Sequence, residues 1–149
     1  MKKFTVHPTT SIFADVNADL EQITSTGRWS NEQMRQIRFG LEDGVDVSVY
    51  ADPRYNYDQM REIRLGLNSG VDVSVYADPK YSWHQMEVIR HGLEYGLDVS
   101  VYADPKYSWQ QMDQILAGLE ADLDVSAYAD PKYDAGQMRV IRNGLRRRS

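Results

Sequence analysis

The feature that most constrains this chain is an eight-residue sequence that recurs every 26 residues. Asp-Val-Ser-Val-Tyr-Ala-Asp-Pro occupies positions 46–53, 72–79 and 98–105, and a copy with Ala127 in place of the second valine occupies 124–131. A period of this length is typical of proteins that stack one supersecondary unit many times. Because a single unit is shorter than the ~40 residues below which chains seldom fold alone, neighbouring units must bury each other's apolar faces.

The period divides the chain into an N-terminal extension or cap, residues 1–18, and a repeat domain, residues 19–149. We expect five units in the repeat domain: a divergent unit at 19–44, then 45–70, 71–96, 97–122 and 123–149. Terminal units of a repeat array usually differ from the inner ones because one of their faces meets solvent.

Each unit contains the pattern of an amphipathic helix of about 12 residues, or ~18 Å. Its apolar stripe places Met, Ile and Leu at i, i+3 and i+7, as at Met86, Ile89 and Leu93. A polar residue followed three places later by Gln, as in Ser82 and Gln85, predicts a capping box at the start. A glycine precedes the stripe's leucine in every unit. Since glycine costs about 1 kcal/mol inside a helix, this repetition indicates close approach of a neighbouring element.

The segment Val45–Ala51 is ambiguous, because its alternating valines also fit a β-strand. A short helix capped by Asp46 and stopped before Pro53 fits equally. The matching slot in the divergent unit, residues 19–23, has a helical composition. We therefore predict an all-α fold, an α-solenoid of five stacked short-helix/long-helix repeats, with an α/β horseshoe of one strand and one helix per repeat as the alternative.

The segment YADPKYSWHQMEVIRHGLEYGLDVSVYADPKYSWQQM, residues 76–112, resembles the tandem "YADP…QM..IR.GL" repeats of uncharacterised proteins from bacterial mobile elements and phages. The resemblance covers residues 19–149. It implies an α-helical repeat and a mobile-element or phage origin, and it carries over no catalytic residues. The first and last units depart from it, with Gly27 in place of proline and Ala135-Gly136 in place of tryptophan and its neighbour.

The charge of the chain argues against a nucleic-acid ligand. Residues 4–145 contain 12 basic and 22 acidic groups, a net charge of −10, and such a surface repels phosphates. It suits a protein partner with a basic face. The absence of cysteine excludes disulfides and thiolate chemistry, and no apolar run reaches the ~20 residues of a membrane span. We therefore expect a cytoplasmic protein with no membrane contact.

Candidate binding residues come from positions that differ between units: 56–58, 61, 62, 65, 68, 69 and their equivalents. Among these, the aromatic residues just inside a predicted helix start are the best interface anchors. The candidate partner-binding residues are Tyr57, Trp83, Trp109, Asp58, His84 and Gln110. The regular column of tyrosines that contains Tyr50 is better explained as core.

Two further groups of polar residues could have a specific role. His84, Glu87 and His91 are a weak metal candidate, because only one unit has them and no fourth ligand is identifiable. We therefore expect no metal and no cofactor. Arginines recur one position past the core isoleucine, as at Arg64 and Arg142, and are expected to pair between repeats.

No nucleophile, base and orienting residue can be assigned from spacing, so we expect no enzyme. The leading hypothesis is a non-catalytic helical-repeat scaffold that binds another protein through its variable surface. The alternative is an acidic phage or mobile-element inhibitor, anti-CRISPR-like or otherwise anti-defence, that blocks a basic nucleic-acid-binding surface of a host protein. A carbohydrate-binding or structural surface repeat is a third class.

Overall fold

The computed structural model describes residues 12–148, and these residues form helices and no strand. They divide into two compact units, with the division between Pro79 and Lys80. The all-α fold expected from the repeat is confirmed. The α/β horseshoe is wrong for the described residues, because the valine-rich slot forms a turn of 3-10 helix in each complete repeat.

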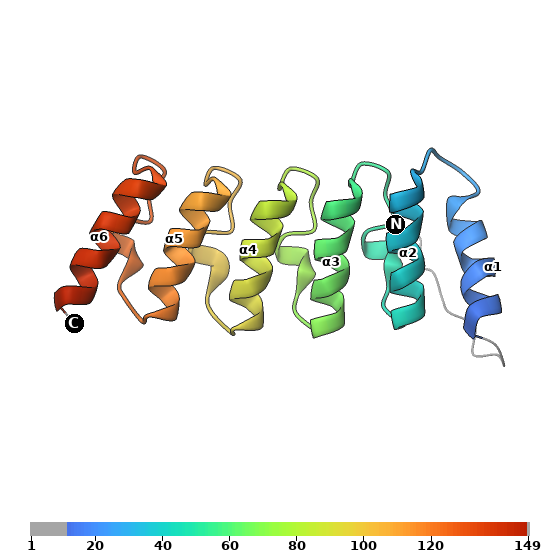
Figure 1. Ribbon diagram of the computed structural model, residues 1–149, viewed down its shortest axis with the longest axis horizontal. Coiled ribbons are helices and arrows are strands. Elements are labelled where there is room, and N and C mark those ends of the chain that lie inside the picture. The colour runs from blue at the N-terminus through green and yellow to red at the C-terminus, as the bar shows by residue number, and fades with distance from the viewer. Residues whose placement is uncertain (1–11, 149) are drawn as a thin grey trace. The chain divides into compact units, whose positions relative to one another are not determined.

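Residues 12–79, the described part of the first unit, form three α-helices and two 3-10 turns. They are α1 (Ile12–Thr24), α2 (Asn31–Asp43), η1 (Val47–Val49), α3 (Tyr57–Ser69) and η2 (Val73–Val75). Helix α2 contacts both α1 and α3, as Figure 1 shows. The boundary expected between residues 18 and 19 falls inside α1, so the divergent repeat begins with a full α-helix instead of a short one.

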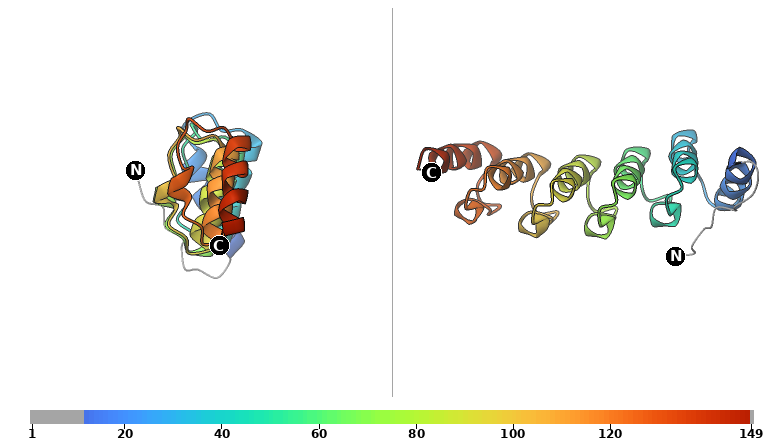
Figure 2. Two further views of the ribbon diagram at one scale, coloured as in Figure 1. Left: turned by 90° about the vertical axis from the view of Figure 1, so that its left-hand side faces the viewer. Right: turned by 90° about the horizontal axis from the view of Figure 1, so that it is seen from below.

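The second unit repeats the same alternation. It contains α4 (Trp83–Glu94), η3 (Val99–Val101), α5 (Trp109–Glu120), η4 (Val125–Ala127) and α6 (Ala135–Arg148). Helix α5 contacts α4 and α6. Within each unit the long helices lie side by side in one layer, and the 3-10 turns lie on one side of that layer (Figure 2).

The short element is a single 3-10 turn because its two ends are fixed. Asp46 is the N-cap of η1, and its Oδ1 accepts hydrogen bonds from the Ser48 amide (3.1 Å) and hydroxyl (2.6 Å). Pro53, four residues beyond the turn, cannot continue a helix. Asp72, Asp98 and Asp124 cap the other three turns in the same way.

Capping boxes start the long helices as predicted, and their glutamines also join successive repeats. Ser82 and Gln85 exchange the two capping hydrogen bonds. The Gln85 Nε2 group then donates to the carbonyl oxygens of Pro105 (3.4 Å) and Tyr107 (2.7 Å) in the following repeat. One side chain thus fixes both the start of its helix and the position of the next loop.

The glycine inside each long helix allows a tyrosine to lie against the helix backbone. The Tyr102 hydroxyl donates a 2.7 Å hydrogen bond to the Val88 carbonyl oxygen. A Cβ atom built on Gly92 would lie 2.6 Å from Val99 Cγ1 and still closer to the Tyr102 hydroxyl. The close approach predicted from the repeated glycine is confirmed, and the same contact recurs at Gly40, Gly66 and Gly118.

The core consists of the predicted stripe together with this tyrosine column. Among the described residues, the largest side chains with under 2% exposure are Tyr50, Tyr76, Tyr102, Tyr128, Ile37, Leu41, Met60, Ile63, Met86, Ile89, Met112 and Ile115. Burial raises the pKa of Tyr128 to about 12 and raises the pKa of Tyr50 and Tyr102 further. These tyrosines are therefore neutral structural groups that hold the 3-10 turn against the preceding helix.

The arginines were expected to pair with acidic residues of the next repeat, but Arg64 and Arg142 contact the preceding repeat, and Arg90 forms an ion pair with Glu94 of its own helix. Arg64 donates to Gln36 Oε1 (3.0 Å) and forms an ion pair with Asp43 (3.2 Å). Arg142 makes the equivalent bond to Gln114 Oε1 (3.2 Å). These contacts position neighbouring helices, although exposed ion pairs contribute only about 0–1 kcal/mol each.

Candidate functional site

The candidate aromatic residues lie at the first turn of the long helices because the capping residues determine where each helix begins. Ser82 and Ser108 are N-caps, so Trp83 and Trp109 are the first residues of α4 and α5. A side chain at this position leaves the end of the helix and does not join the apolar stripe. Trp109 is 37% exposed, whereas Trp83 is half-buried.

In the second unit the candidate residues form a stack of three rings. The His84 ring lies 3.5 Å from the Trp83 ring, centroid to centroid, with 29° between their planes. On its other side the His84 ring lies 5.0 Å from the Trp109 ring at 21°. The imidazole is thus held between two indoles from successive helices. Each of the three was a candidate binding residue from the sequence, but their mutual contact depends on how α4 and α5 pack.

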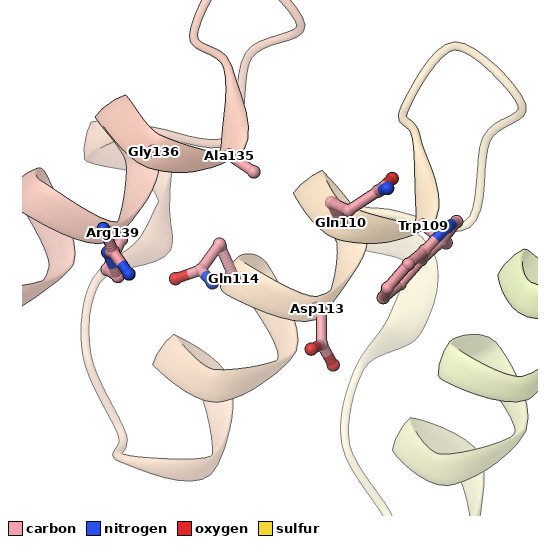
Figure 3. A pocket seen from close by; sticks show the side chains of 7 residues that line it. All are labelled: Trp109, Gln110, Asp113, Gln114, Ala135, Gly136 and Arg139. Carbon is pink, nitrogen blue, oxygen red and sulfur yellow. The ribbon is translucent and has the colours of Figure 1, made fainter.

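Beside Trp109 is a cleft of about 270 Å³ between α5 and α6 (Figure 3). It is lined by Trp109, Gln110, Asp113, Gln114, Ala135, Gly136 and Arg139. Asp113 and Arg139 give it one acidic and one basic group, and Gln114 extends from α5 toward Arg139 (Figure 3). Ala135 and Gly136 stand where the preceding repeat has Trp109 and Gln110, so small side chains form the α6 side.

All seven lining residues occupy positions that differ between repeats, the equivalents of 57, 58, 61 and 62. Asp113, Gln114 and Arg139 belong to the variable positions expected to bind a partner, as equivalents of 61 and 62, although they are not among the six candidate residues named from the sequence. The sequence spacing indicates that these three residues belong with the candidate residues. They lie one helical turn after Trp109-Gln110 or Ala135-Gly136 and therefore share a helix face with them. The spacing could not predict that α5 packs against α6 and brings the two helix faces together.

Tyr57 and Asp58 lie at the start of α3 in the first unit. Tyr57 is 46% exposed, and Asp58 is half-buried. The first unit has a different hollow, of about 600 Å³, on its 3-10 side. Asp52, Asp72 and Asp78 are among its lining residues. The Arg54 side chain donates hydrogen bonds to Asp52 and lowers the pKa of that carboxyl.

His84, Glu87 and His91 do not form a metal site. Among residues 12–148 no group of three His, Asp or Glu side chains is arranged to hold a metal ion. His84 is stacked between the indoles, and the His91 ring lies 6.5 Å from the Tyr95 ring at 39°. Their spacing places the three residues along one face of α4. Both imidazole rings, however, contact aromatic rings and do not converge on a shared metal position.

Comparison of the chain with protein-family models, with curated proteins and with solved structures found no match. None of the helices formed by residues 12–148 combines the length and apolar character needed to cross a membrane.

Proposed function

We propose that this protein is a non-catalytic helical-repeat scaffold that binds another protein through its variable surface, with Trp109 and the adjoining cleft as the centre of the contact. One observation carries the proposal. The residues that join the repeats, such as Gln85, Gly92 and Tyr102, recur from unit to unit, whereas every residue that lines the cleft varies. Stacking therefore depends mainly on the recurring positions, and most variable positions can match a partner. Gln114 does both, because its Oε1 accepts a hydrogen bond from Arg142 of the next repeat.

The chemistry of the cleft supports a protein ligand. An indole at an interface centre offers a large apolar area with few rotatable bonds, and such residues often contribute more than about 2 kcal/mol to binding. Stacking on His84 restrains the Trp109 ring before a partner arrives, which lowers the entropy lost on binding. Asp113 and Arg139 then provide opposite charges that can fix the partner's orientation.

The test compares partner capture by matched variants in the native host. Trp109→Ala removes the proposed anchor, while Tyr95→Ala removes another exposed aromatic residue of the second unit, which is 62% exposed and lies outside the cleft. We expect Trp109→Ala to reduce recovery of a specific partner more than tenfold at nearly unchanged melting temperature, and Tyr95→Ala to leave recovery unchanged. Equal recovery by both variants would contradict the proposal.

A second candidate function is an acidic inhibitor, of phage or mobile-element origin, that covers a basic nucleic-acid-binding surface of a host protein. The net charge of −10 over residues 4–145 and the Asp-lined hollow of the first unit favour it. Such binding should weaken steeply with ionic strength, and nucleic acid should compete with it. Binding through the Trp109 cleft should be nearly insensitive to both. Under either candidate the proposed location is the cytoplasm.

A further inference from the structure

Helix α6 carries the same glycine-centred face that the other repeats use to receive the next 3-10 turn. In α5 this face is covered: a Cβ built on Gly118 would lie 2.6 Å from Val125 Cγ1. The equivalent residue of α6 is Gly144, and among the described residues nothing lies within 4 Å of a Cβ built there. In the described part of the chain, α6 therefore has the glycine that makes room for a turn but no turn packed against it.

The residues around Gly144 have the exposure expected of an interface that is not covered. Val140 is 69% exposed, whereas its equivalents Glu62 and Val88 are 1% and 5% exposed. Ile141 is partly exposed, whereas Ile115 at the same position is fully buried. A mainly apolar hollow of about 440 Å³ lies here, lined by Tyr133, Gly136, Gln137, Val140 and Ile141.

The polar group that would hold an incoming loop is already in place. Gln137 accepts a hydrogen bond from the Asp134 amide (2.8 Å), as Gln111 does from Ser108 (2.8 Å). The Nε2 group of Gln111 in addition donates to Tyr133 O (2.7 Å) of the next repeat. Gln137 is thus held by the same capping hydrogen bond as Gln111. Its side chain is exposed, so its Nε2 group can donate to an incoming loop.

We propose that this face of α6, formed by Gln137, Val140, Ile141 and Gly144, binds a segment of another chain that carries the repeat's own turn sequence, Asp-Val-Ser-Val-Tyr-Ala-Asp-Pro. The structure contains four copies of this interface within the chain, each with the same glycine, valine and tyrosine contact. Charge also fits, because the segment carries two aspartates and α6 ends in the exposed Arg146, Arg147 and Arg148.

A second copy of this chain is a poorer occupant than a separate partner. The tyrosines of all four turns in the described residues, Tyr50, Tyr76, Tyr102 and Tyr128, already lie fully buried against their own glycines. A second copy would have to release one of these buried contacts. The proposed partner instead carries a turn of this sequence whose tyrosine is not already packed against a glycine of its own chain. This surface adjoins the cleft beside Trp109 at Gly136, which lines both hollows, but it does not include Trp109.

The test is NMR titration of the isotope-labelled full chain with a synthetic peptide of residues 97–122, one complete repeat. We expect saturable shifts confined to the amide of Gly144 and the methyl groups of Val140 and Ile141. Gly144→Ala should abolish them without lowering the melting temperature, because the added methyl group meets nothing in the free protein. A peptide with Tyr102→Phe should bind about fivefold to tenfold more weakly, the effect of one net hydrogen bond.

Three results would overturn the proposal. The first is no shift at these signals up to the solubility limit of the peptide, and the second is equal binding by wild type and Gly144→Ala. The third is a concentration-dependent shift of the same signals without peptide, which would assign the face to a second copy of the chain.

Discussion

Replacing Gly92 by alanine tests the packing that holds the repeats together. The new Cβ would lie 2.6 Å from Val99 Cγ1 and closer to the Tyr102 hydroxyl, which is held by its hydrogen bond to the Val88 carbonyl oxygen. Neither neighbour is the free end of a flexible side chain. The substitution must therefore displace the 3-10 turn or the tyrosine.

The expected size follows from three opposing contributions. Alanine gains about 1 kcal/mol of helix propensity over glycine. Overpacking costs about 1–3 kcal/mol, and loss of the Tyr102 hydrogen bond leaves a buried carbonyl unsatisfied at about 1–3 kcal/mol. Gly92→Ala should thus lower the free energy of unfolding by about 1–5 kcal/mol. Gly144→Ala meets no neighbour and should raise it by up to about 1 kcal/mol.

Urea unfolding followed by circular dichroism measures both variants under identical conditions. The double variant Gly92→Ala/Tyr102→Phe gives a further check, because removing the hydroxyl relieves the closest contact and its effect should be less than additive. If Gly92→Ala and Gly144→Ala change stability equally, or if the effects of Gly92→Ala and Tyr102→Phe simply add, the proposed packing is refuted.

Two more predictions concern single residues. Burial raises the pKa of Tyr128 from 10.0 to about 12. The neutral hydroxyl therefore contributes its full stability below pH 10, and this contribution is lost as the pH rises through 12. Melting curves between pH 8 and 12 should show the loss, and Tyr128→Phe should reduce the pH dependence. Asp122 has a φ of 57° at the helix end where other repeats have Gly70 and Gly96. Because glycine adopts this left-handed conformation without steric cost, Asp122→Gly should leave the free energy of unfolding in urea unchanged or raise it by about 1 kcal/mol. A clear loss of stability would show that the left-handed backbone at Asp122 is not strained.

Repetition within the chain made local structure predictable. The Met-Ile-Leu stripe, the capping boxes and the close approach at the glycine could all be derived from comparing units, because the same physical requirement appears several times in one sequence. The valine-rich slot stayed ambiguous, since alternation of valines fits both a strand and a capped turn. The structure has a 3-10 turn because Asp46 caps its start and the Tyr50 hydroxyl bonds to the Gln36 carbonyl oxygen.

The candidate site was harder to predict because it depends on contacts between helices. Sequence spacing placed His84, Glu87 and His91 on one helix, and this favoured a metal site only if nothing else occupied the space between them. The rings of Trp83 and Trp109 occupy the two faces of His84 instead. Asp113 and Arg139 belong to different helices, and only the packing of α5 against α6 brings them to one cleft.

Site-specific photo-crosslinking in the native host tests most directly whether the variable surface binds a partner. A photoreactive phenylalanine derivative replaces Gln110, which lines the cleft, or Tyr95, which is exposed outside it. The proposal predicts one discrete protein adduct from position 110 that disappears when Trp109→Ala is added, and none from position 95. An adduct from position 95 alone, equal adducts from both positions, or no adduct from position 110 would contradict it.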